Sequence, residues 1–305
     1  MKSVFKIIFI SIILGFQVNT TFAGSCCGGG SSSSLILVGD NIQEYSLGLT
    51  YRNDLGQTDN EGWATFHNNQ IVDNQMSLNF QFQRQIYDHF QLAIKSSLIQ
   101  KDIVKQNRHE QTTGLADIDL QSTYEYLPEY TYSPWKPRGF IYLKLSIPTS
   151  NSLYDSNSPI YSDVRGSGLY SISSGTFFIK HLSAVTLKSA IEWQHFLGRN
   201  FDQTYIKDYD KLIIPLGLSY GFDPLPIALG TGATWNYQTP KKFSGLVQGS
   251  ASSEYFWEIS VFANWIISRE VIIGLSYSDS TLVGKNINSP LYRTLGFTYT
   301  NATAF

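Results

Sequence analysis

The chain has 305 residues and a formal net charge of −2, and only 15% of its residues are charged, against about 25% in soluble globular domains. A nearly neutral chain without a basic cluster lacks the concentrated positive face that nucleic acids require, so no nucleic-acid partner is expected. Tyr and Phe occur 19 times each, whereas Met occurs only 2 times. This composition is typical of many-stranded membrane sheets with aromatic strand ends.

The N-terminus has the three parts of an export signal. Lys2 and Lys6 supply the positive charge, residues 7–16 form a short apolar run, and Thr21 and Ala23 are the small residues before a cleavage point. We therefore predict that residues 1–23 are a signal peptide and that the mature chain is exported. The apolar run is too short for an ordinary membrane-spanning helix.

The segment 24–40, rich in Cys, Gly and Ser, follows the predicted cleavage point and is expected to be a flexible arm. Its two cysteines are adjacent, Cys26 and Cys27. Residues 23–26 resemble a lipobox, which would make Cys26 a lipid anchor, although Ala23 stands where that pattern usually has Leu. A soft metal ion bound by the two thiols is a weaker alternative, and no metal or cofactor is predicted.

Period-two alternation of apolar and polar side chains recurs from Asn41 to the C-terminus and predicts β-strands. In residues 76–83 every even position is apolar and every odd position is Ser, Asn or Gln. Successive side chains of a strand point to opposite faces, so one face is apolar and the other polar. We predict about twelve strands, near residues 45–52, 76–83, 90–95, 117–126, 141–147, 169–180, 185–194, 212–222, 227–235, 254–261, 270–277 and 294–299.

Long and short links alternate along this pattern. Four links are tight, at 87–89, 181–183, 223–225 and 268–269, and six are long, at 53–75, 101–114, 151–166, 198–211, 238–253 and 279–290. The link 128–139 should be short and is not. An even strand number with this asymmetry is typical of bacterial outer-membrane barrels, whose short turns are periplasmic.

The predicted fold class is therefore all-β: a transmembrane antiparallel up-and-down β-barrel over residues 41–305, in a Gram-negative outer membrane, with both termini periplasmic. Its apolar face would meet outer-membrane lipids and its polar face would line a lumen. The alternative is a soluble β-sandwich that uses the apolar faces as its core. The chain ends on Phe305, preceded by Phe297 and Tyr299. This ending resembles the signal read by the barrel-assembly machinery, although Asn301 and Thr303 depart from it.

Nine charged residues fall on the predicted lumen face, and together they carry both signs: Glu44, Lys95, Asp117, Asp119, Glu125, Lys144, Lys188, Glu192 and Glu258. A lumen of mixed sign would select solutes through charge and hydrogen bonding. The same residues would instead fill the barrel if they paired across it. About twelve strands lie between the filled eight-stranded barrels and the open sixteen-stranded porins, so both outcomes stay open.

An enzyme is the least favoured class. Some barrels carry a Ser and His pair at the outer rim, as lipid hydrolases or acyltransferases, and His195 is the histidine placed for such a role. The sequence has no Gly-x-Ser-x-Gly elbow, and Glu192 is the nearest acidic residue that would orient His195. No catalytic residue is therefore predicted. A structural or adhesive barrel with a plugged lumen is the other alternative.

Three motifs occur in order: Gly114-Leu115-Ala116-Asp117-Ile118-Asp119-Leu120, then Ile147-Pro148-Thr149-Ser150, then Gly166-Ser167-Gly168. In order and spacing, residues 41–305 resemble the outer-membrane family named for the MetA pathway of phenol degradation. The resemblance implies a transport barrel for small, often aromatic compounds. Ala116 and Ser150 stand where the family has Gly, which leaves the subfamily and the solute open. We therefore expect a channel for passive passage of small organic solutes.

Overall fold

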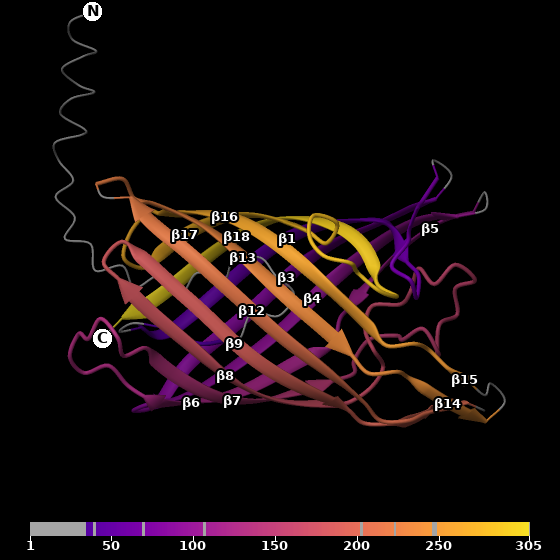
Figure 1. Ribbon diagram of the computed structural model, residues 1–305, viewed down its shortest axis with the longest axis horizontal. Coiled ribbons are helices and arrows are strands. Elements are labelled where there is room, and N and C mark those ends of the chain that lie inside the picture. The colour runs from indigo at the N-terminus through magenta and orange to yellow at the C-terminus, as the bar shows by residue number, and fades with distance from the viewer. Residues whose placement is uncertain are drawn as a thin grey trace, which may run out of the picture.

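A computed structural model describes residues 35–38, 41–68, 71–105, 108–201, 204–222, 224–245 and 249–304. Within these residues one antiparallel sheet of fourteen strands contains a closed barrel (Figure 1). The twelve strands that close the barrel are β1 (Asn41–Thr58), β3 (Val72–Tyr87), β4 (Phe90–Lys105), β6 (Ile118–Leu127), β7 (Arg138–Ile147), β8 (Ser171–Leu182), β9 (Val185–Phe196), β12 (Tyr209–Phe222), β13 (Ile227–Gln238), β16 (Glu254–Ile266), β17 (Val271–Asp279) and β18 (Pro290–Ala304).

Closure is made by the first and last strands. β18 pairs antiparallel with β1 from Asn41↔Ala304 to Gln57↔Pro290, which leaves neither strand with an open edge. The predicted twelve-stranded antiparallel barrel is therefore confirmed. Among the described residues we find no helix with the length and apolarity needed to cross a membrane.

Strand alternation sorts the side chains onto two faces. In β3, Leu78 and Phe80 are exposed, Phe80 to 45%, whereas Ser77 and Gln83 are buried. Exposed Leu, Ile, Phe and Tyr side chains recur at every second position around the wall. A soluble sandwich would bury these residues in its core, so their exposure rules that alternative out. The apolar face meets lipid, and the polar face points into the lumen.

The two ends of the barrel differ. At the short-link end, residues 88–89 and 183–184 join their strands in two residues, and His89 and Ser183 adopt the positive φ angles, 65° and 54°, that such tight hairpins use. The C-terminal end of β18 lies here as well. The link 128–137 is the exception and is long, as its sequence indicated.

The opposite, long-link end contains structure that the sequence pattern did not reveal. The predicted loop 101–114 is mostly strand, because β4 runs on to Lys105 and β5 (Arg108–Leu115) pairs with it. A short β2 (Ala64–Phe66) pairs with β1. The predicted loops 198–211 and 238–253 build a second sheet from β10 (Arg199–Phe201), β11 (Thr204–Ile206), β14 (Lys242–Gly245) and β15 (Gly249–Ser250). β5, β14 and β15 all lie toward the right end of the barrel in Figure 1, β5 above and β14 and β15 below.

An apolar cluster anchors these outer segments. Leu169, Phe196, Phe201, Ile206 and Tyr209 are buried against one another, and Ile206 is fully buried. The cluster joins the long-link ends of β9 and β12 to the second sheet. Burying this apolar area holds the long links in place.

Candidate functional site

The barrel interior is the candidate site, and the predicted lumen residues lie there. In the strand registers, Glu44 is opposite Gln83, and Lys95 is opposite Asp119. Both pairs alternate with exposed apolar residues and so point inward. The same alternation places the other strand residues of the predicted set on the inward face: Glu125, Lys144, Lys188, Glu192 and Glu258. Asp117 lies in the two-residue link between β5 and β6.

A buried network crosses three strands near the middle of the wall. Glu192 on β9 accepts hydrogen bonds from the Tyr142 hydroxyl at 2.8 Å and from Lys144 Nζ at 2.5 Å, both on β7. β8 separates these strands, and its Gly175 is in register with both Tyr142 and Glu192. A Cβ on Gly175 would come within 2.4 Å of the Tyr142 ring. The absence of a side chain at Gly175 therefore lets Tyr142 and Glu192 meet across β8.

The other inward carboxylates are also hydrogen-bonded. At the short-link end, Arg138 donates two hydrogen bonds to Glu125, of 2.7 and 3.0 Å. Gln83 donates to Glu44 at 2.7 Å, and the Tyr292 hydroxyl donates to Glu258 at 2.7 Å. Of these donors, Arg138 is charged, whereas Gln83 and Tyr292 are neutral.

The three motifs behind the family resemblance meet in space. Asp117 accepts hydrogen bonds from the Ser150 hydroxyl at 2.6 Å and from the Ser167 amide at 3.1 Å. Thr149 Oγ1 donates to the Ala116 carbonyl at 2.6 Å. A Cβ on Gly166 would fall 2.1 Å from Ser150 Oγ and 2.4 Å from Asp117 Oδ1, so a side chain there would displace both groups. These residues fix the long link 148–170 to the wall, which gives Asp117 a structural role as well as a place in the lumen.

A cavity of about 270 Å³, the lumen cavity, lies beside these hydrogen-bonded residues. Lys95, Asp119 and Arg165 bring charges of both signs to its wall. The Ser146 hydroxyl donates to Asp119 at 2.6 Å. The remaining lining residues are Ser97, Ala116, Asp117, Ser146, Ser167, Ser171, Gln194 and Phe196. The arrangement suits a small solute that carries hydrogen-bonding groups.

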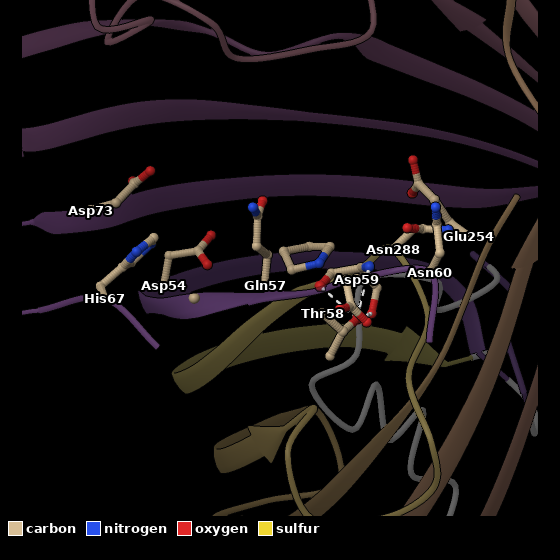
Figure 2. A pocket seen from close by; sticks show the side chains of 12 residues that line it. Asp54, Gln57, Thr58, Asp59, Asn60, His67, Asp73, Glu254 and Asn288 are labelled. Carbon is tan, nitrogen blue, oxygen red and sulfur yellow. Dashed lines mark hydrogen bonds between the residues drawn. The ribbon is translucent and has the colours of Figure 1, made fainter. Parts of the chain in front are cut away.

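A second hollow, the mouth hollow, lies at the long-link end and has a volume of about 550 Å³. In Figure 2, Asp54, Asp73 and His67 stand along one part of it, and Glu254 and Asn288 stand at the other. The carboxylates give this entrance a negative lining. Sequence reasoning had not singled out these residues, because they sit where strands run into long links.

Residues 35–38, the plug segment, lie inside the lumen. Leu35, Ile36, Leu37 and Val38 are each at most 4% exposed. Gln91 exchanges two hydrogen bonds with the Leu37 backbone, of 2.9 and 3.1 Å. These four residues are the described part of the arm 24–40 that was expected to be flexible. The available signal was their unbroken apolar run next to a Gly- and Ser-rich stretch.

His195 has an acidic partner that sequence reasoning did not find. Its Nδ1 lies 2.8 Å from Asp210, and its ring stacks on Trp193. The expectation that Glu192 was the nearest orienting acid is wrong, because Glu192 points inward and His195 outward. Asp210 accepts the hydrogen bond from His195 Nδ1, and the other ring nitrogen, Nε2, lies 3.9 Å from Asp208 Oδ2. In an acyl-transfer pair, a nucleophile would be hydrogen-bonded to Nε2.

Three predicted features lie outside the described residues: the signal peptide 1–23, the Cys26–Cys27 pair and Phe305. They stay predictions.

Comparison with solved structures finds the same barrel fold in outer-membrane proteins. The chain is similar to an outer membrane channel from Pseudomonas putida F1, with a TM-score of 0.71 and 12% identity over 90% of this chain and 100% of that chain. It is also similar to the transport unit of the autotransporter AIDA-I from Escherichia coli, with a TM-score of 0.50 and 10% identity over 87% of this chain and 90% of that chain. At these identities the likeness shows the fold. No protein-family model and no curated protein sequence matches the chain.

Proposed function

We propose that the protein is an outer-membrane channel through which small organic solutes pass by diffusion, and that it performs no enzymatic reaction. The observation that carries the proposal is a closed barrel with an outward apolar belt and a lumen cavity lined by Lys95, Asp119 and Arg165. A barrel whose wall served only as an anchor would need no hydrogen-bonding cavity of this kind. The likeness to an outer membrane channel supports the same function.

The lining favours neutral or zwitterionic solutes. Strong ion preference comes from rings of one charge sign, whereas the lumen face carries both signs. Aromatic solutes fit this class, and the family resemblance through Asp117, Thr149 and Gly166 points to the same compounds. Membership of the MetA-pathway family is part of the proposal.

The proposal includes an orientation and two partners. The short-link end, where β1 begins and β18 ends, faces the periplasm, because outer-membrane barrels keep their short turns there, and we propose that both termini are periplasmic. Lipids surround the apolar belt, and the barrel-assembly machinery reads the ending at Phe305. Separation of cell envelopes on a density gradient tests this placement. We expect the protein with the outer membrane, and its recovery as a soluble periplasmic protein would contradict the proposal.

Transport is tested with purified protein in liposomes. We expect faster swelling in small neutral or aromatic solutes than in protein-free liposomes. Ser97→Trp puts a bulky ring into the lumen cavity and is expected to slow swelling several-fold. Ser96→Trp is the matched control, because the neighbouring residue points to the lipid face. Equal swelling rates for the two variants would show that solutes do not pass this cavity.

A structural barrel is the second candidate, and the plug segment is the observation in its favour, since residues 35–38 fill part of the lumen. Liposomes as tight as protein-free ones, together with no conductance in planar bilayers, would favour that function.

A further inference from the structure

An apolar surface interrupts the polar lumen on strands β7 and β8. Phe140, Tyr142 and Ile179 are at most 2% exposed and pack together with Phe177. Phe140 and Phe177 are direct cross-strand partners, with ring centroids 6.0 Å apart. We call these four residues the apolar seat. Inward positions of a barrel usually meet water, so an apolar seat there is costly unless something covers it.

The plug segment covers the seat. Ile36 and Val38, two residues apart in the chain, place their side chains in one cluster with Phe140, Tyr142 and Ile179. Leu35 and Leu37, the alternate residues, have their backbone groups bound by Gln121 and Gln91.

The wall holds the plug segment through side chains. Gln91 donates to the Leu37 carbonyl and accepts from the Leu37 amide, and Gln121 donates to the Leu35 carbonyl at 2.8 Å. Both glutamines are nearly buried, at 6% and 3% exposure. The segment belongs to neither sheet. A ligand with an apolar body and one hydrogen-bonding group could therefore replace its contacts with the seat and the amides.

From these contacts we propose that the apolar seat is the lumen's binding site for small solutes with an apolar or aromatic body and a hydroxyl or carbonyl group. Ile36 and Val38 occupy the site in the resting chain. A solute that binds the seat takes Gln91 or Gln121 as its polar partner and displaces residues 35–38, which widens the lumen. The inference rests on the proposed channel function and names the solute class and the element that restricts passage.

The experiment measures conductance in planar bilayers. Ile36→Asp with Val38→Asp puts carboxylates against the seat, and an unpaired carboxylate is strongly disfavoured in an apolar contact. This variant is expected to conduct about tenfold more than the wild type, because the open population rises as the seated one falls. Ile36→Val with Val38→Ile keeps the seat filled and is expected to conduct like the wild type.

The ligand arm uses benzyl alcohol, which has an aromatic ring and a hydroxyl, against glycerol at the same concentration. Benzyl alcohol should raise wild-type conductance several-fold, and glycerol should not. Phe140→Ser with Ile179→Ser should remove the response to benzyl alcohol while raising basal conductance. If the variant with Phe140→Ser and Ile179→Ser fails to fold, as judged by its mobility on unheated gels, Phe177→Ala serves as a milder second variant.

Two results would overturn the inference. One is that the wild type conducts and the variant with Ile36→Asp and Val38→Asp conducts no more than it does. The other is a benzyl alcohol response of equal size in wild type and seat variants, which would place the effect in the bilayer. If no folded variant conducts, including the one with the charged plug segment, then the channel function itself fails. These outcomes separate the two proposals.

Discussion

At the scale of single residues, position on the wall decides what a side chain does. Tyr142 and Glu192 form a hydrogen bond of 2.8 Å across an intervening strand, and they can do so because Gly175 offers no side chain between them. A buried carboxylate that lost both Tyr142 and Lys144 would keep its charge without partners, which is costly. The network therefore depends on a residue that contributes no polar group.

Gly175→Ala tests that dependence. The new Cβ would lie 2.4 Å from the Tyr142 ring and 2.8 Å from the Ile191 carbonyl. We expect a loss of about 1–3 kcal/mol in the free energy of unfolding, as for other overpacked sites. Gly217→Ala is the matched control, because its Cβ would have no neighbour closer than 3.7 Å. Urea unfolding in lipid vesicles measures both, and equal effects would contradict the role given to Gly175.

The two faces of the wall predict opposite tolerance for charge. Phe80 is 45% exposed toward lipid, and Phe80→Arg is expected to cost about 2–4 kcal/mol if it lies near the membrane midplane. Gln81→Arg, one residue along, points into the lumen opposite Ser46 and Lys95 and is expected to cost less. The same unfolding assay compares them. Equal destabilisation would mean that the faces are wrongly assigned.

At the scale of elements, the long link 148–170 behaves as part of the wall. Ser158 and Ser162 donate hydrogen bonds of 2.5 and 2.8 Å to one oxygen of Glu110 on β5, and Thr112 donates to the Ser162 carbonyl. Together with the hydrogen bonds that Asp117 accepts from Ser150 and Ser167, these contacts hold the link over the lumen cavity. The link is held in place by side chains of β5, a strand that extends beyond the barrel.

This attachment should depend on pH. Hydrogen bonds from Ser158 and then Ser162 lower the pKa of Glu110 below its ordinary value. The contact is therefore complete above the ordinary Glu pKa of about 4.3 and is lost as the pH falls through the lowered value. We expect the protection of amides 158–162 against hydrogen exchange, relative to their intrinsic rates at each pH, to fall on acidification below about pH 4.

Glu110→Gln isolates that contribution, because a glutamine carbonyl accepts the same hydrogen bonds and does not titrate. Asp163 in the same link also has a lowered pKa: burial opposes the shift, but hydrogen bonds from Ser156 and the Asn157 amide outweigh it. The protection of amides 158–162, relative to their intrinsic exchange rates, should lose much of its pH dependence in the variant. An unchanged profile would assign the effect to Asp163 instead.

At the scale of the whole molecule, closure makes the barrel resistant to unfolding. Every barrel strand has two neighbours, and the β1–β18 ladder joins the ends of the chain. Local opening of one strand therefore breaks two ladders at once, so unfolding is cooperative.

Heat-modifiable mobility follows from this closure. Unheated protein in SDS should stay compact and migrate faster than boiled protein, because detergent alone does not open a closed ladder. Phe80→Arg should lower the temperature of the shift, and Gln81→Arg should leave it nearly unchanged. A mobility that is the same before and after boiling would contradict a closed barrel in solution.

The architecture could be predicted from the amino-acid sequence, because the information that specifies it is local. The period of two in residues 76–83 assigns each side chain to a face, and tight links such as 88–89 fix which strands are neighbours. The inward placement of Lys95 and Glu192 follows from the same parity. These features need no knowledge of contacts between distant segments.

Which residues meet across the wall depends on the tertiary structure. Asp210 reaches His195, and Gly175 lies between Tyr142 and Glu192, because strand register brings them together. The plug segment lies in the lumen because its apolar residues pack against the apolar seat on β7 and β8, about a hundred residues or more away in the chain. Such contacts depend on the complete barrel: hydrophobic burial and hydrogen bonding act between whichever groups the closed wall places side by side, whatever their separation in sequence.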